Sequence, residues 1–247
     1  MLHALTRWFK AAPKPASGWP EVAAWARARG WVFRGVRESD GFVIEGRSGA
    51  LPWRVEWGPS QRAYIDGFEL RFRAELPVPG EMQVLLLSRP LMELMERTVF
   101  DQYVEGVQTR IDTEIPPEMR WLVMFPKLGT AELKTLREGY AAVTNHKPWA
   151  TLWLGAPLAT AVKAAPLPPG VPLVLMVARG RLSIRTPLAS PSAALLDSWM
   201  KLFDVALREA RRAAAEEGGQ SVASTQPSMW ASSGLPVPAA QASAMRG

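Results

Sequence analysis

The stretch LPWRVEWGPSQRAYIDGFELRFRAELPVP, residues 51–79, places aromatic rings and arginines in close alternation. It could be a nucleic-acid platform, or it could be a pair of antiparallel strands with one apolar side. A nucleic-acid platform needs its rings and its arginines on the same exposed face, because base stacking and phosphate contact occur on one side of a sheet. The two interpretations therefore differ in which residues share a face.

Side chains alternate between the two faces of a strand, so odd and even positions separate. Trp53 and Trp57 are in phase with Val55, whereas Arg54 falls on the opposite face with Glu56. The downstream run repeats the pattern: Phe68, Leu70 and Phe72 on one parity, Glu69, Arg71, Arg73 and Glu75 on the other. We expect the rings to face a core and the arginines to face solvent, beside carboxylates that pair with them across strands.

Period-two alternation extends from residue 31 to residue 88 and predicts an antiparallel meander. Residues 31–36 and 42–45 flank the turn cluster RESDG, and Asp66-Gly67 separates two further alternating runs. Residues 82–87 are continuously apolar, which favours a central strand. A helix is expected to begin at residues 88–90 and to end at Gly106.

The second half of the chain is mixed. Strands are expected at 108–115, 120–125 and 149–154, and helices at 130–144 and from Pro157. Residues 171–186, VPLVLMVARGRLSIRT, predict a hairpin. A long helix follows, with Ser190 as N-cap and Pro191 at its first position. Its apolar stripe comprises Leu196, Trp199, Phe203 and Leu207.

These elements predict an α+β fold: antiparallel sheets, formed by a meander and hairpins, packed by helices and anchored by eleven tryptophans. We divide the chain into a basic N-terminal segment with its linker (1–18), two α+β halves (19–106 and 107–217) and a disordered tail (218–247). The tail is assigned from its Ser, Gln, Ala and Pro content. Both halves end in an apolar strand, a Ser/Thr–Pro element and an amphipathic helix, so duplication is one interpretation.

Composition excludes several chemistries. The chain has no cysteine, which rules out disulfides, thiolate metal sites, cysteine nucleophiles and iron–sulfur clusters. His3 and His146 are the only histidines, so a histidine-rich metal site is excluded as well, and we expect no cofactor and no metal. The longest apolar runs, such as 171–178, are far shorter than a membrane-spanning helix requires.

The net charge of +6 resides entirely in residues 1–37, and the rest of the chain is balanced. Nucleic-acid binding is therefore disfavoured, with a basic N-terminal arm as the remaining alternative. Arginine greatly outnumbers lysine, and Ala, Gly and Pro are abundant, which indicates a bacterial origin.

Three patterns could carry catalysis, and each has an ordinary structural interpretation. Ser198 and Lys201 have Ser-x-x-Lys spacing but lack the companion motifs of such enzymes. His146 lies at a proline-constrained turn, where it is expected to end a helix. The best carboxylate group is Asp112, Glu114 and Glu118, which we interpret as a solvated face. The chain is therefore expected not to be an enzyme, although a carboxylate or hydroxyl active site without a sequence signature remains the alternative.

The function that we expect is a cytoplasmic, non-enzymatic interaction or accessory module that recognises another protein. Arg179, Arg181 and Arg185 crowd one hairpin, and Arg62 lies near a turn. These four arginines could contact a phosphate or an acidic partner, although hairpin tips are ordinarily polar. Oligomeric state has no sequence signal.

The N-terminal segment combines Leu5, Trp8 and Phe9 with Arg7 and Lys10. Such a basic amphipathic element could lie on the anionic inner face of a membrane and attach the protein peripherally. The alternative is that its apolar side docks on the body of the same protein.

Removal of residues 1–14 is predicted to abolish sedimentation with anionic liposomes. Each basic side chain near the surface contributes about 1 kcal/mol, so binding of the full-length protein should be reversible and should weaken with salt. The measurement is co-sedimentation at 50 mM salt. Equal pelleting of both proteins, or pelleting of neither, would remove the membrane interpretation.

Overall fold

The computed structural model describes residues 19–36, 40–104 and 116–224. Its strands form one eight-stranded sheet in the order β1-β2-β3-β4-β8-β7-β5-β6, and every neighbouring pair is antiparallel. The strands are β1 (Val32–Gly35), β2 (Phe42–Ser48), β3 (Leu51–Pro59), β4 (Phe68–Glu75), β5 (Val84–Ser88), β6 (Tyr140–Thr144), β7 (Val174–Ala178) and β8 (Arg181–Pro187). The predicted α+β class is confirmed.

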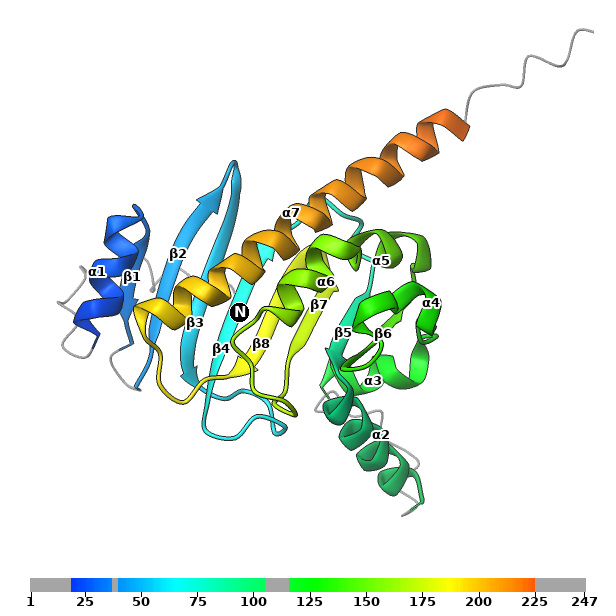
Figure 1. The fold of residues 1–247 in the computed structure, drawn as a ribbon, viewed down its shortest axis with the longest axis horizontal. Coiled ribbons are helices and arrows are strands. Elements are labelled where there is room, and N and C mark those ends of the chain that lie inside the picture. The colour runs from blue at the N-terminus through cyan, green and yellow to red at the C-terminus, as the bar shows by residue number, and fades with distance from the viewer. Residues whose placement is uncertain (1–18, 37–39, 105–115, 225–247) are drawn as a thin grey trace, which may run out of the picture.

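Seven α-helices occur in the described part of the chain (Figure 1). They are α1 (Pro20–Ala28), α2 (Arg89–Val104), α3 (Pro117–Met124), α4 (Thr130–Leu133), α5 (Lys147–Trp153), α6 (Ala156–Lys163) and α7 (Ala193–Ser224), and a short 3-10 turn covers Lys134–Leu136. None of these helices has the length and apolar character needed to span a bilayer.

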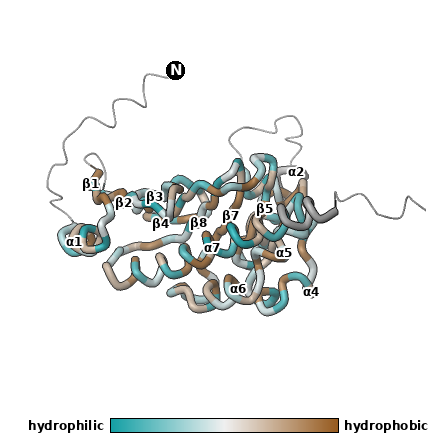
Figure 2. The backbone as a smooth tube through the Cα atoms, turned by 90° about the horizontal axis from the view of Figure 1, so that it is seen from above, coloured by the Kyte–Doolittle hydropathy of each residue, from teal (hydrophilic) through white to brown (hydrophobic). Residues whose placement is uncertain are grey.

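The first face of the sheet is apolar from edge to edge. One row of cross-strand partners crosses all eight strands: Phe33, Ile44, Val55, Phe72, Ile184, Leu175, Leu86 and Ala142. Helices α1, α5, α6 and α7 contribute to the same core cluster as this row. Figure 2 shows α1, α7 and α6 together on one side of the strands. The main core therefore lies between the first face and these helices.

The second face has two parts, which the next row of partners reveals. In sheet order this row is Arg34, Val43, Glu56, Arg71, Arg185, Val174, Leu87 and Ala141. Over β7, β5 and β6 it is apolar, and α2 and α3 pack there in a second, smaller core cluster. Over β2, β3, β4 and β8 it is mostly charged.

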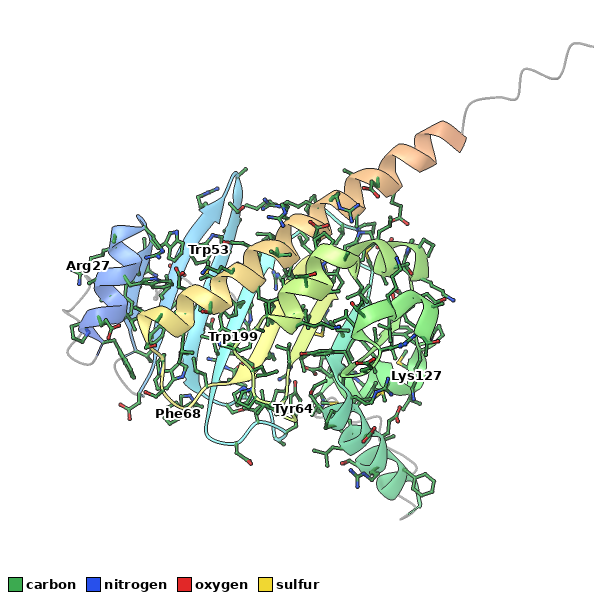
Figure 3. The ribbon with its side chains drawn as sticks, viewed as in Figure 1. Arg27, Trp53, Tyr64, Phe68, Lys127 and Trp199 are labelled. Carbon is green, nitrogen blue, oxygen red and sulfur yellow. The ribbon has the colours of Figure 1, made fainter. Side chains whose placement is uncertain are left out.

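The opening stretch folds as its parity predicts. Trp53 and Trp57 are buried on the first face, and Figure 3 labels Trp53 near α7. Trp57 stacks on Phe68 with ring centroids 4.6 Å apart, and its Nε1 donates a hydrogen bond to the carbonyl of Leu188 (2.7 Å). A Cβ at Gly46, the cross-strand partner of Trp53, would collide with the indole ring, so glycine is required there.

The long C-terminal helix is confirmed, but both of its predicted limits are wrong. It begins at Ala193, and Ser192 rather than Ser190 caps it, because the Ser192 hydroxyl accepts the backbone N–H of Leu195 (3.3 Å). The helix continues to Ser224, so residues 218–224, which we expected in the tail, are helical. Residues 225–247 of the predicted tail lie outside the described part of the chain.

Three predicted elements in the second half are wrong. Residues 120–125 belong to helix α3, and residues 149–154 overlap helix α5. Both helices carry a proline within their first two positions, and Trp149 and Trp153 are buried at helical spacing. The expected helix at 130–144 is instead α4, a 3-10 turn and strand β6. Short apolar runs fit a helix or a strand equally well, so packing decides between them.

Both predicted halves contribute to the one sheet. Strand β5 lies between β7 and β6, and β8 pairs with β4. The division at residue 106 therefore stays a prediction about sequence units. The expected strand at 108–115 and the N-terminal segment lie outside the described residues.

Phe203→Ala is predicted to lower the free energy of unfolding by about 3–5 kcal/mol, because it leaves a cavity in the main core. Phe203 is fully buried and contacts the rings of Trp53 and Phe72. Phe100→Ala is the matched control, since Phe100 is exposed and its loss should change stability by less than about 0.5 kcal/mol. Urea titration measures both, and similar losses would contradict this packing.

Candidate functional site: the charged part of the second face

Strand register alone brings opposite charges together on the second face. Arg71 in β4 is the cross-strand partner of Glu56 in β3 and of Arg185 in β8. These side chains form the arginine–glutamate cluster, which we define as Glu56, Glu69, Arg71, Arg185, Arg62, Tyr64 and Glu118. The last three come from the β3–β4 loop and from α3.

Glu69 is the centre of the cluster and is fully buried. Its Oε1 accepts hydrogen bonds from Arg71 Nη1 (2.8 Å), from Arg185 Nη1 (2.9 Å) and from the backbone N–H of Gln61 (3.1 Å). Two guanidinium groups thus share one buried carboxylate oxygen. Burial of these charges is tolerated because each is paired and hydrogen-bonded.

Arg71 connects Glu69 to the neighbouring carboxylate. Its Nε donates to Glu56 Oε2 (3.1 Å), and Arg54 Nε lies 2.6 Å from Glu56 Oε1. Arg71 also donates to the carbonyl of Pro59 at the end of β3 (3.2 Å). The cluster therefore fixes the relative positions of β3, β4 and β8.

Glu118 attaches helix α3 to the β3–β4 loop. Its Oε1 accepts hydrogen bonds from Arg62 Nε (3.0 Å) and from the hydroxyl of Tyr64 (3.0 Å), and the residue is fully buried. Figure 3 labels Tyr64 in this loop. Burial raises the pKa of Tyr64, and the nearby Glu118 carboxylate raises it further. Burial opposes the charged form of Arg62, but the Glu118 carboxylate outweighs it, so the pKa of Arg62 is raised.

One oxygen of each central carboxylate has no partner. Oε2 of Glu69 and Oε2 of Glu118 are buried without a hydrogen bond from any described residue. Buried carboxylate oxygens of this kind ordinarily bind ordered water. The described residues contain no group of three or more acidic or histidine side chains that could hold a metal ion.

Arg73 is exposed, unlike Arg71 and Arg185 of the same face. Its cross-strand partners are Arg54 and Ser183, and no described residue forms an ion pair with it. Partial burial lowers the pKa of Arg73, and the neighbouring guanidinium groups lower it further, against the opposite effect of Glu56. Positive charge is thus in excess around Arg73.

The four predicted anion contacts do not form one site. Arg179 is exposed at the tip of the β7–β8 hairpin with φ 51°, and Arg181 pairs with Glu75 (2.9 Å). Arg185 and Arg62 instead belong to the arginine–glutamate cluster. Anion binding by these four residues stays a prediction.

The expectation that the second-face arginines all face solvent is wrong for Arg71, which is buried. Its contacts with Pro59 and Glu69 hold it against the end of β3, beneath the β3–β4 loop. Sequence parity identified the face but did not mark Glu69 or Arg73 as site residues. Their only sequence signal was the parity that they share with Arg71.

The remaining catalytic candidates are engaged elsewhere. The Ser198 hydroxyl donates to the carbonyl of Ala194 (3.2 Å), and Lys201 lies 3.6 Å from Asp197. The prediction that His146 ends a helix is wrong, because His146 directly precedes α5. Its Nε2 lies 3.2 Å from Glu217 Oε1. The interpretation of Glu118 as part of a solvated face is wrong, because it is fully buried and accepts hydrogen bonds from Arg62 and Tyr64. Asp112 and Glu114, the other members of that carboxylate group, lie outside the described residues.

Helices α2 and α3 expose apolar side chains beside the cluster. We call Leu94, Phe100, Val123 and Met124 the α2–α3 patch. Phe100, Val123 and Met124 are 65%, 70% and 68% exposed. Single exposed apolar residues are common, but several large ones on two neighbouring helices are characteristic of interaction surfaces.

No family model and no curated protein match the chain. Among solved structures it is similar to the mycobacterial trehalose monomycolate transport factor A, TtfA, at 10% sequence identity and a TM-score of 0.43. That alignment covers 78% of this chain and 92% of the other. A similarity this weak establishes neither a common fold nor a common activity.

Glu69→Gln is predicted to lower the free energy of unfolding by about 3–5 kcal/mol. The amide keeps the shape of the side chain but leaves the buried guanidinium groups of Arg71 and Arg185 without their shared negative charge. Glu75→Gln is the control, because the Glu75–Arg181 pair is exposed and should contribute less than about 1 kcal/mol. Denaturant unfolding would contradict the central role of Glu69 if the two variants lost equal stability.

Proposed function

We propose that this chain is a non-enzymatic interaction or accessory module that recognises another protein through the second face of its sheet. The observation that carries the proposal is the α2–α3 patch, whose apolar side chains are exposed. Arg73, which is also exposed, lies on the same face of the sheet. Exposure of these apolar side chains to water is unfavourable, and a docked partner would remove them from water.

The composition of this face supports the proposal. Protein interfaces are enriched in aromatic residues, methionine and arginine, and commonly have an apolar centre with a polar rim. On this face, Phe100 and Met124 supply apolar contacts, and Arg73 supplies a polar one. Helix α2 projects from the end of the sheet, where a partner can reach it (Figure 1).

The arginine–glutamate cluster gives this surface a rigid base. The buried carboxylates of the cluster form ion pairs with arginines of the same chain. These carboxylates therefore contribute to structure rather than to acid–base chemistry. Glu118 fixes α3, which carries Val123 and Met124. A preorganised surface binds more tightly, since less conformational freedom is lost on association.

The proposal places the module in the bacterial cytoplasm, with peripheral membrane contact through the N-terminal segment as an additional element. The membrane contact is supported by the basic and apolar residues of that segment, which are Arg7, Lys10, Leu5, Trp8 and Phe9.

An enzyme remains the alternative, and one hollow favours it. This hollow, of about 310 Å³, is lined by Ser48, Asp204, Leu207, Arg208 and Arg211. Burial raises the pKa of Asp204, as in many general acids. However, the Ser48 hydroxyl accepts a hydrogen bond from Arg211, and the lining residues include no second acid or base.

The double variant Phe100→Ser/Val123→Ser is predicted to lose its partner in affinity capture from the native cell, with recovery reduced at least about tenfold. A loss of only 1.4 kcal/mol of binding free energy gives this factor. The control is Val32→Ser/Val36→Ser, which alters exposed valines at the β1 edge instead.

Quantitative mass spectrometry measures the recovery, and circular dichroism confirms that both variants fold. Equal recovery with both variants would contradict the use of the α2–α3 patch. Absence of any stoichiometric partner, together with turnover in a hydrolase screen, would favour the enzyme.

A further inference from the structure

Arg73 occupies the middle of the second face, on β4, the fourth strand of the eight-strand sheet. The flanking positions on β3 and β8 are Arg54 and Ser183. Neither neighbouring position offers Arg73 a negative charge. Among the described residues, none accepts a hydrogen bond from the exposed Arg73 guanidinium, so its hydrogen-bond acceptor is water.

The surrounding charges cannot compensate for it. The guanidinium groups of Arg54, Arg71 and Arg185 lie near Arg73. The carboxylates that β2, β3 and β4 carry on this face are Glu45, Glu56, Glu69 and Glu75, and each already forms an ion pair with another arginine. A carboxylate brought by a partner would form charge-assisted hydrogen bonds with Arg73 and reduce the repulsion among the arginines.

The shape of the surface selects the kind of ligand. Small molecules bind in concave pockets, and Arg73 lines neither the hollow of about 320 Å³ beside Arg89 nor the one of about 310 Å³ beside Asp204. A nucleic acid requires a continuous basic track, but Glu45, Glu56 and Glu75 interrupt this face. A membrane would need apolar side chains here, whereas the exposed ones lie on α2 and α3 and at the β1 edge.

We propose that Arg73 is a carboxylate-binding site that receives an acidic segment of the partner protein, while the α2–α3 patch receives its apolar side chains. This assignment rests on the proposed function, because it assumes that a protein docks on the second face. It adds the chemistry of the partner: an acidic segment in addition to an apolar anchor. Charge complementarity of this kind favours specificity and fast association.

The test uses a fluorescein-labelled peptide of eight glutamates and the full-length protein at 50 mM salt, measured by fluorescence anisotropy. Arg73→Gln should weaken binding at least tenfold. Arg181→Gln is matched to it in charge and exposure and lies on the adjacent strand, but Arg181 already pairs with Glu75, so its Kd should change less than twofold. Thermal melting confirms that both variants fold, as expected for exposed side chains.

Three results would overturn the site. They are equal weakening by both variants, which indicates an effect of net charge alone; no peptide binding by the wild-type protein; and displacement of the peptide by equimolar inorganic phosphate, which indicates a small-anion site.

Failure of the proposed function is distinguishable from failure of this site. If capture of the native partner depends on Phe100 and Val123 but is unchanged by Arg73→Gln, the carboxylate site is wrong and the interaction module stands. If the peptide binds through Arg73 but no partner is captured from the cell, the carboxylate site stands and the proposed function fails.

Discussion

The pairing of β4 with both β3 and β8 is the interaction on which the rest of the structure depends. It joins the N-terminal meander to the strands of the second half and places β4 inside the sheet. Phe72 faces the main core, whereas Arg71 and Arg73 face the other side. Because side chains alternate, a shift of one residue would exchange these faces and bury the arginines in the apolar core. Alternation in this one strand therefore determines which of its sides faces the main core and which carries charge.

Buried charges on the second face specify the strand register more narrowly than apolar packing does. A slip of β8 by two residues would preserve the parity of every side chain, so the apolar row could still form. It would, however, place Ser183 or Pro187 opposite Arg71 in place of Arg185, and Glu69 would lose one of its two cations. Removal of one partner from a buried ion pair strongly destabilises the protein, although an intact pair adds little net stability. The arginine–glutamate cluster thus selects one register among those that the hydrophobic pattern permits.

Sequence reasoning succeeded where the hydrophobic period was long and failed where it was short. Alternation through residues 51–76 and the stripe on α7 each extend over several turns or strand residues, so one interpretation fits them. Trp149 and Trp153 lie in a run of only six residues, which a strand also fits, and only packing against α7 shows the helix. The site was less predictable still. Glu118 meets Arg62 only because α3 packs beside the β3–β4 loop, and nothing in the local sequence records that contact.

Helix α3 links the two parts of the second face, and its short length explains why. Eight residues are too few for a helix to be stable alone, so α3 depends on its tertiary contacts. Glu118 binds the loop beside the cluster, Trp121 packs under α2, and Val123 and Met124 remain exposed. The buried and the exposed residues are only a few positions apart on one rigid element. Any change that displaces Glu118 must therefore also move the apolar side chains, which couples the internal ion pairs to the surface that a partner would contact.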